Sequence, residues 1–279
     1  MNRIPFLISI PHGGVEVPEE IRGRVALTAE DLLYYSDPCT LEIFDLFRMA
    51  EVVTAASISR LIVDLNRPPY HLPPAHPDGV VKTCTVDGRA VYREGRFPDP
   101  PLVHRMLLRH YFPFHDGIDR SLDTGRIRLG IDCHTMLPVG PPSHRDAGKK
   151  RPLICLGNNG DAEGNPLPGK LTTCPPEWLQ AVSREFAREF PDPGAVRLND
   201  PFAGGFVSLM HFWRRGTPWI QIEVNRALYG AAVPGGAPAP GSPRLRELRD
   251  LIEGVLLGFW EGAGNTPDPR AGNDRRPNR

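Results

Sequence analysis

The sequence predicts an α/β fold, a single domain whose mostly parallel or mixed sheet carries helices on both faces. Short runs rich in isoleucine and valine are apolar nearly throughout, which is typical of strands covered on both sides. Amphipathic segments with helical spacing lie between these runs, and such an alternation of strands and helices is typical of an α/β sheet. The predicted strands occupy residues 6–10, 51–56, 60–65, 126–133, 152–157 and 218–224.

Helix start signals precede two of the amphipathic segments. Thr28 and Asp31 form a start that is similar to a capping box, with Asp where Glu or Gln is usual. Asp37 followed by Pro38 predicts a second helix with Asp37 as its N-cap, because proline is favoured at the first helical position. The spacing of apolar residues predicts four more helices, over 102–122, 175–190, 205–215 and 245–259.

Three stretches interrupt this alternation. Residues 68–100 are rich in proline and are expected to form a long excursion near the functional site. Residues 230–243 are predicted to be a loop, because they consist mainly of proline, glycine and alanine. Residues 263–279 are polar and lack periodicity, so we expect a disordered tail after a catalytic domain that spans residues 1–262.

Composition argues against several classes of protein. The chain has 33 basic and 33 acidic residues, and this balance disfavours nucleic acid or an anionic membrane as the main partner. The sequence has no apolar run of transmembrane length and no recognisable signal peptide, so we expect a cytoplasmic protein. The cysteines are odd in number and widely spaced, which favours free thiols; they are Cys39, Cys84, Cys133, Cys155 and Cys174.

Polar side chains gather at or near the ends of four predicted strands. In α/β sheets the reactive groups collect where strands end and loops begin. These side chains are therefore the candidates for a functional site. In chain order they are His12, Asn66, Arg67, His134, Glu223 and Arg226.

Two histidines are candidate metal ligands. His12 precedes two glycines, which let the backbone turn sharply and approach a ligand; the alternative is a histidine that simply ends a strand. Asp132 and His134 share one face of a strand, so that Asp132 either orients a ligand or only satisfies a polar pair. Asp37 can complete a set of two histidines and one carboxylate, and Glu16 is the competing carboxylate.

Glu223 is the candidate for proton transfer. It lies in an apolar strand between Ile222 and Val224. Burial raises the pKa of a carboxyl group, which suits proton transfer near neutral pH. The alternative is a salt bridge to Arg67 or Arg226. Both arginines suit bidentate recognition of a carboxylate, and a structural ion pair is their alternative role.

Other chemistry is disfavoured by missing motifs. The sequence has no Walker A motif, no Gly-rich dinucleotide fingerprint after a strand, no G-x-S-x-G and no H-E-x-x-H. Nucleotide binding, serine-hydrolase chemistry and ordinary zincin chemistry are therefore disfavoured. His115 and His211 lie beside aromatic residues in predicted helices, and a position in the core or at its rim is the default for both.

Six motifs occur in a fixed order along the chain, namely PHGG, SDP, SRLIVDLNRPP, DCHTM, NDPFAGGF and QIEVNRALY. Together they resemble the N-formylglutamate amidohydrolase family, which is similar to the zinc carboxypeptidases and their phosphorylase/hydrolase-like fold. The resemblance covers roughly residues 4–230. It implies a metal-dependent hydrolase that removes a formyl or other acyl group from the nitrogen of an amino acid.

The resemblance also implies a role for each candidate. His12 and His134 would be ligands of Zn²⁺ or another divalent metal, with Asp37 as the third ligand and Glu16 as the second choice. Glu223 would be the general base. The residues implied for substrate binding are Asn66 and Arg67, together with Arg226, which would either do the same or support Glu223.

Two alternative functions stay open. One is a carboxypeptidase-like peptidase or a deacylase for another N-acyl amino acid. The other is a non-catalytic protein that binds a small ligand, although binding alone needs no proton carrier such as Glu223.

Overall fold

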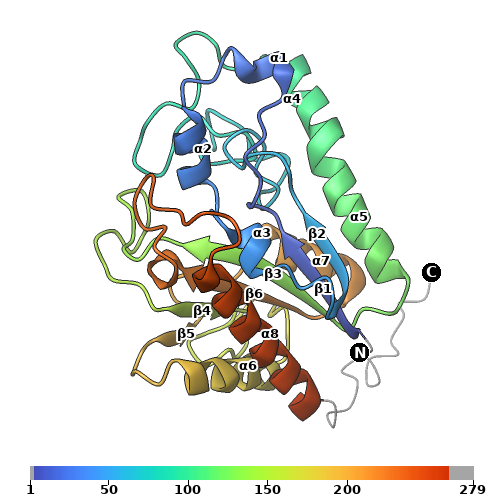
Figure 1. The fold of residues 1–279 in the computed structure, drawn as a ribbon. Helices are drawn as coiled ribbons and strands as arrows, with labels where there is room; N and C mark the ends of the chain where they lie inside the picture. Colours follow the sequence, from blue (N-terminus) through green and yellow to red (C-terminus); the bar gives the residue numbers. More distant parts are fainter. Residues whose placement is uncertain (1–2, 264–279) are drawn as a thin grey trace, which may run out of the picture.

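A six-stranded sheet forms the centre of the protein (Figure 1). The computed structural model describes residues 3–263. The strand order is β2-β1-β3-β6-β4-β5, and the pairs are parallel except for β4, which runs antiparallel to β6. This confirms the predicted mixed, mostly parallel sheet. The strands are β1 (Ile4–Ile10), β2 (Ala50–Ala55), β3 (Leu129–Met136), β4 (Ile154–Gly157), β5 (Val196–Leu198) and β6 (Trp219–Asn225).

The predicted helices all lie close to observed ones. Thr28 and Asp31 form a complete capping box at the start of α2, as their spacing predicts. A π-helical turn, Leu107–Tyr111, joins α4 and α5 into one continuous helix. The helices are α1 (Glu19–Arg22), α2 (Ala29–Tyr35), α3 (Thr40–Ile43), α4 (Pro100–Met106), α5 (Phe112–Asp123), α6 (Pro176–Glu189), α7 (Phe206–Arg215) and α8 (Pro243–Ala263), with a 3-10 turn at Arg226–Leu228.

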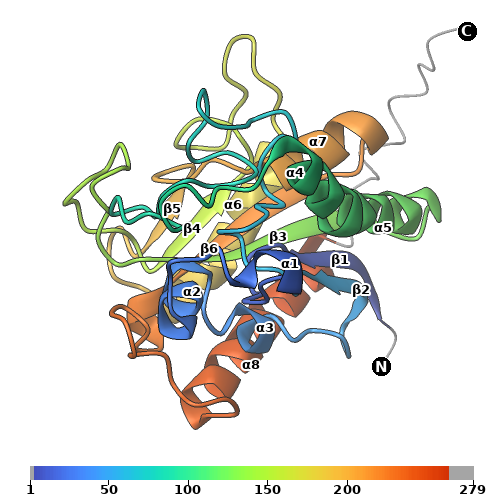
Figure 2. The ribbon, with the colours of Figure 1, turned by 90° about the horizontal axis from the view of Figure 1, so that it is seen from above.

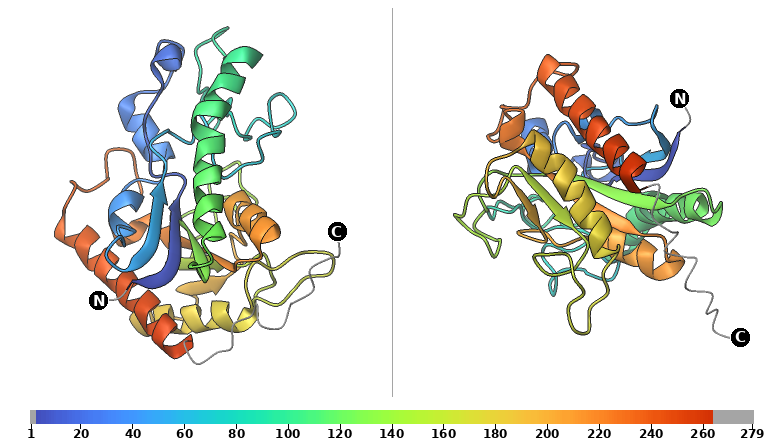
Figure 3. Two further views of the ribbon diagram at one scale, coloured as in Figure 1. Left: turned by 90° about the vertical axis from the view of Figure 1, so that its right-hand side faces the viewer. Right: turned by 90° about the horizontal axis from the view of Figure 1, so that it is seen from below.

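Helices cover both faces of the sheet, as expected. One apolar core lies between the sheet and α3, α6 and α8, and a second lies under α4, α5 and α7. Figure 2 shows α4, α5 and α7 on one side of the sheet and α3 and α8 on the other. Figure 3 shows α6 and α8 packed side by side. The fold is therefore one layered α/β domain.

The two central strands place polar side chains on one face. Ile222 in β6 points into the core under α6 and α8, so its neighbours Gln221 and Glu223 point to the opposite face. In the ladder of β3 with β6, Asp132 pairs with Gln221 and His134 pairs with Glu223. Four polar side chains therefore share one face near the carboxyl ends of these strands.

One predicted strand is absent. Residues 61–65 are buried, but the backbone of the segment forms turns. The N–H groups of Ile62 and Val63 donate to the Ser59 carbonyl, and the N–H of Asp64 donates to Val80. An apolar run shows that a segment is buried, but it does not show whether a neighbouring strand pairs with it. Conversely, β5 is short and partly exposed, and its sequence carries no strong strand signal.

The excursion predicted over residues 68–100 leads from the turn after β2 to the start of α4, and it contributes residues to the pocket described below. Between residues 3 and 263, no helix is both long and apolar enough to cross a membrane. Except for Ala263, which ends α8, the predicted tail lies outside the described residues.

Candidate metal centre and pocket

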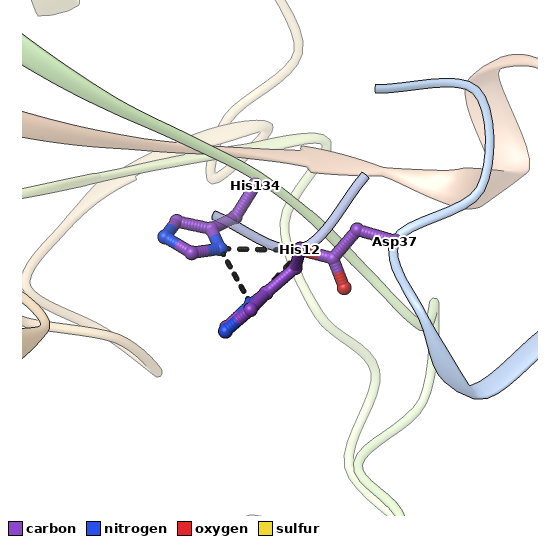
Figure 4. Close-up of side chains that lie close together, drawn as sticks. All are labelled: His12, Asp37 and His134. Carbon is purple, nitrogen blue, oxygen red and sulfur yellow. Dashed lines mark hydrogen bonds and ion pairs between the residues drawn. The ribbon is translucent and has the colours of Figure 1, made fainter. Parts of the chain in front are cut away.

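Three segments distant in sequence bring His12, Asp37 and His134 together. His12 follows β1, Asp37 lies between α2 and α3, and His134 lies within β3. All three are at most 2% exposed. Figure 4 shows the two imidazole rings and the carboxylate pointing toward one another. These are the three residues that the resemblance assigned to the metal.

The spacing of the ligand atoms fits a tetrahedral metal ion. The Nδ1 atoms of His12 and His134 lie 3.1 Å apart, and Oδ2 of Asp37 lies 3.2 Å from His134 Nδ1 and 3.6 Å from His12 Nδ1. Zinc ligands at 2.0–2.1 Å from a tetrahedral ion lie about 3.3 Å from one another. Two imidazoles and a carboxylate are also an ordinary donor set for catalytic zinc. The residues present therefore fit a divalent metal ion.

The far side of each imidazole contacts a buried carboxylate. His12 Nε2 lies 2.7 Å from Oδ1 of Asp64, and His134 Nε2 lies 3.1 Å from Oδ2 of Asp132. A carboxylate accepts the Nε2 hydrogen and leaves the Nδ1 lone pair free for a metal. Asp64 and Asp132, which we call the backing acids of the two histidines, are fully buried. The geometry thus fixes the ring orientation and the tautomer that metal binding requires.

Asn66 connects the two backing acids to the pocket. Its backbone N–H donates to Asp64 and its side-chain amide donates to Asp132. Its side-chain carbonyl accepts the N–H of Val207 at the start of α7. A Cβ atom on Gly205 would lie only 2.3 Å from the Asn66 amide nitrogen, so the second glycine of NDPFAGGF makes room for this side chain.

Asp37 is held by cations and by backbone. Its Oδ2 accepts the N–H of Thr135, and its Oδ1 lies 3.2 Å from Arg60 and 3.3 Å from Arg226. Burial alone would raise the pKa of Asp37, but the contacts with both histidines and the charge of Arg60 hold it well below its ordinary value. The carboxylate is therefore ionised.

The prediction that Asp37 is a helix N-cap is wrong. The N-cap of α3 is Cys39, and Asp37 contributes only its backbone carbonyl, which accepts from the N–H and hydroxyl of Thr40. The side chain turns the other way because the arginines and Thr135 bind it. An N-cap signal in the sequence reports only that a short acidic side chain is present, not which donors reach it.

Arg226 is bound to the segment that carries Asp37. Its guanidinium donates to the carbonyls of Tyr34 and Ser36 and to the hydroxyl of Thr135. It is 5% exposed. The bonds to Tyr34 and Ser36 hold the chain just before Asp37, and the bond to Thr135 connects it to β3.

Glu223 lies next to His134 across the β3–β6 ladder. It is 7% exposed and accepts a hydrogen bond of 2.8 Å from Gln221. Burial raises the pKa of Glu223 to about 7, although the charge of His134 opposes the rise. A carboxyl group with this pKa exchanges protons readily near neutral pH.

Glu16 belongs neither to the cluster of His12, Asp37 and His134 nor to the lining of the adjoining pocket. A Cβ atom on Gly14 would lie 2.2 Å from the Ser57 carbonyl, so the chain passes Ser57 at a distance that only glycine permits. The backbone of Glu16 then bonds to Ser57 and Ser59, and its side chain is exposed. The structure therefore groups Asp37, and not Glu16, with the two histidines.

The cluster opens into a pocket of about 180 Å³. Arg67 lies at its rim, 32% exposed, and its guanidinium contacts Asp78 in the excursion. Arg151 also lines the pocket; it forms a two-point ion pair with Asp146 and lies over the ring of Phe202. The basic residues that line the pocket are Arg60, Arg67, Lys82, Arg151 and Arg226.

His115 and His211 form a buried polar chain behind the pocket. His115 donates to the Leu65 carbonyl through Nε2, its Nδ1 lies 3.1 Å from His211 Nε2, and His211 Nδ1 lies 2.8 Å from Asp119. Burial lowers the pKa of both histidines to about 3. This chain anchors the backbone between Asp64 and Asn66, so these histidines support the site from the core.

Sequence reasoning missed several residues of the site. The sequence pattern does not single out Arg60, Lys82 or Gln221. Asp64 differs from them, because it is an acid inside the apolar run of residues 60–65. That signal was informative, because a buried carboxylate needs partners. Nothing in the sequence indicates which basic residues reach it, since Lys82 comes from the middle of the excursion.

Fold and site together define an α/β protein with a buried cluster of two histidines and one carboxylate at the end of the sheet. Known proteins with similar sequences show the family to which it belongs. The N-formylglutamate amidohydrolase family matches residues 4–230. An N-formylglutamate deformylase of Pseudomonas putida is 30% identical over 240 residues, 82% of each chain. One of Pseudomonas aeruginosa is 29% identical over 273 residues, covering 91% of this chain and 94% of the relative.

Solved structures have the same fold. N-formylglutamate amidohydrolase from Ralstonia eutropha JMP134 gives a TM-score of 0.72 at 19% identity, over 94% of this chain and 96% of the other. A gene product of Agrobacterium tumefaciens gives a TM-score of 0.64 at 19% identity, over 94% and 92% of the two chains. The chain belongs to the N-formylglutamate amidohydrolase family, which confirms the resemblance that the six motifs indicated.

The backing of His134 by Asp132 can be tested through metal affinity. We expect Asp132→Asn to weaken zinc binding roughly 10–100-fold, because loss of a carboxylate behind a histidine ligand typically has this effect. Competition with a chromophoric chelator measures the affinity. Asp116→Asn, at an exposed position of α5, is the matched control. Equal zinc affinities in the two variants would show that Asp132 does not contribute to metal binding.

Proposed function

We propose that this protein is a zinc-dependent amidohydrolase that converts N-formylglutamate and water into formate and glutamate. The observation that carries the proposal is the convergence of three ligand atoms, 3.1–3.6 Å apart, beside a buried carboxyl group. Membership of the family and the names of the Pseudomonas relatives favour the N-formyl substrate.

His12, Asp37 and His134 would hold the metal. A zinc ion bound there would lower the pKa of a water molecule toward neutrality and polarise the carbonyl group of the substrate. Asp64 and Asp132 keep both imidazoles in the required tautomer, and Arg60 and Arg226 hold the third ligand ionised. The chain's own contribution is thus a site assembled before substrate arrives.

Glu223 would move the proton. Its carboxylate accepts a proton from the attacking water and delivers it to the amide nitrogen as the C–N bond breaks, so that the leaving amine departs uncharged. The raised pKa of this group makes both transfers feasible near neutral pH. Gln221 fixes the carboxylate by donating to it.

Arg67 and Asn66 would bind and place the substrate. Arg67 stands at the rim of the pocket and Asn66 at its floor beside His134. A guanidinium suits a carboxylate, and holding the substrate by its carboxylate places the amide near the water. We assign Arg226 to the support of Asp37, because it contacts that carboxylate and its hydrogen bonds to Tyr34 and Ser36 hold the chain just before it.

Removal of the proton carrier is the direct test of the mechanism. We expect Glu223→Gln to retain about one zinc per chain and to lose roughly 10²–10⁴-fold in kcat, the usual contribution of general acid–base catalysis. Metal analysis and formate release measure the two quantities. Wild-type turnover in this variant would reject Glu223 as the base. Full activity of metal-stripped protein would show that the reaction does not require a metal ion.

The buried carboxyl group also predicts a pH-dependent stability. In the metal-free protein Glu223 ionises at about 7 when folded and near its ordinary value of 4.5 when unfolded. Its ionisation therefore favours the unfolded state. Relative to Glu223→Gln, the wild-type free energy of unfolding should fall between pH 4.5 and 7 and stay roughly 3 kcal/mol lower above pH 7. Urea unfolding at several pH values measures this, with exposed Glu189→Gln as the control.

A panel of substrates separates the remaining alternatives. We expect N-formylglutamate to have a higher kcat/KM than N-acetylglutamate, N-formylleucine or a dipeptide ending in glutamate, because the small pocket and its basic rim favour a short acyl group and an acidic amino acid. Faster release of glutamate from the dipeptide would indicate a peptidase. Tight binding of N-formylglutamate without product would indicate a non-catalytic binding protein.

A further inference from the structure

The carboxylate of Asp78 forms ion pairs with two cationic side chains that line the pocket. Asp78, in the excursion over residues 68–100, contacts both Arg67 and Lys82 with its carboxylate oxygens. All three residues line the pocket. The side chain of Asp78 is 57% exposed, whereas that of Lys82 is 4% exposed. A buried ammonium group and a partly exposed guanidinium thus share one exposed carboxylate.

The two cations are held independently of that carboxylate. Lys82 lies 2.9 Å from Oδ2 of the buried Asp64. Arg67 donates through Nε to the backbone carbonyl of Asp78 and through Nη1 to the carbonyl of Asn66. Both cations therefore stay in place if the Asp78 carboxylate turns away into solvent.

The backbone that carries Asp78 is itself fixed. The N–H of Val80 donates to His71, and the carbonyl of Val80 accepts from Asp64. A Cβ atom on Gly79 would lie 1.9 Å from the His71 carbonyl, so the turn is tight. Movement of the Asp78 carboxylate is therefore a change of side-chain rotamer, which exposed residues make on a fast timescale.

We propose that Arg67 and Lys82 form the subsite for one carboxylate of the substrate, and that Asp78 is an internal competitor that the substrate displaces. The inference rests on the proposed function, which it deepens by adding Lys82 to the substrate site. Asp78 thereby becomes a residue that sets the affinity and specificity of the subsite, although it makes no contact with the reacting atoms.

Charge balance explains why this exchange is possible. Arg60, Arg67 and Lys82 face three carboxylates, and two of those, Asp37 and Asp64, are buried and irreplaceable. Only Asp78 is exposed. Exchange of Asp78 for a substrate carboxylate keeps the cluster neutral, so no buried charge loses its partner.

The exchange also selects the ligand. A tethered carboxylate competes at an effective concentration that reaches the millimolar range or above. A ligand that offers a carboxylate to both cations overcomes this competition, whereas a neutral group leaves Asp78 in place. The subsite therefore admits an anionic group and rejects an uncharged one of the same size.

Asp78→Asn tests the proposal. The amide keeps the size of the side chain and the backbone carbonyl that anchors Arg67, but it removes the competing charge. We expect KM for N-formylglutamate to fall on the order of tenfold, with kcat within about twofold of wild type. Glu94→Gln, an exposed carboxylate in the same excursion, removes the same charge and should leave KM unchanged.

A second measurement separates this proposal from the proposed reaction. Glutarate has two carboxylates and no amide, and calorimetry should show it binding to Asp78→Asn on the order of tenfold more tightly than to wild type or Glu94→Gln. This result holds or fails even if N-formylglutamate is not hydrolysed. A higher KM and weaker glutarate binding would show that Asp78 only positions the cations. Unchanged values would also overturn the proposal.

Discussion

The close approach of two imidazole nitrogens is the interaction on which the site depends. Nδ1 of His12 and Nδ1 of His134 lie 3.1 Å apart, and their outer nitrogens are committed to Asp64 and Asp132. Two lone pairs at this distance repel each other unless a cation lies between them. The charge of Asp132 accordingly holds the pKa of His134 well above its ordinary value despite burial. The arrangement of these side chains therefore favours a positive charge between the two imidazoles.

The sheet supplies the precision of this arrangement. Because side chains alternate along β3, one strand places Cys133 in the apolar core and Asp132 and His134 in the site. The parallel register then sets Glu223 beside His134 without any loop in between. The remaining ligands come from loops at the same end of the sheet, and buried ion pairs rather than strand geometry hold those loops. Arg60, for example, bridges Asp37 and Asp64.

This division explains what the sequence could predict. Apolar runs identify most of the strands, and the period of two along a strand places Asp132 and His134 on one face. The motifs identify the three candidate metal ligands. Contacts between loops leave no periodic trace, so Lys82 and Arg60 were missed and the apolar run over residues 60–65 was interpreted as a strand. The N-cap interpretation of Asp37 failed for the same reason. Local propensity was correct for Thr28 at an exposed helix start, but distant arginines decided the conformation of Asp37.

The charges around the site also bear on which substrate it takes. Four basic side chains near the metal centre cancel four acidic ones, and these are Arg60, Arg67, Lys82 and Arg226 with Asp37, Asp64, Asp78 and Asp132. A divalent ion adds two positive charges that no carboxylate of this set offsets. Glu223 offsets at most one of them, and only when it has lost its proton. When one carboxylate of a dicarboxylate ligand takes the place of Asp78, the other carboxylate and ionised Glu223 together offset the two charges of the ion. An N-acyl amino acid with an apolar side chain brings only one carboxylate and leaves one of these charges without an offset. The same ion that would activate water would therefore favour N-formylglutamate over N-formyl amino acids with an uncharged side chain. The subsite of Arg67 and Lys82 gives one of the two carboxylates a defined place.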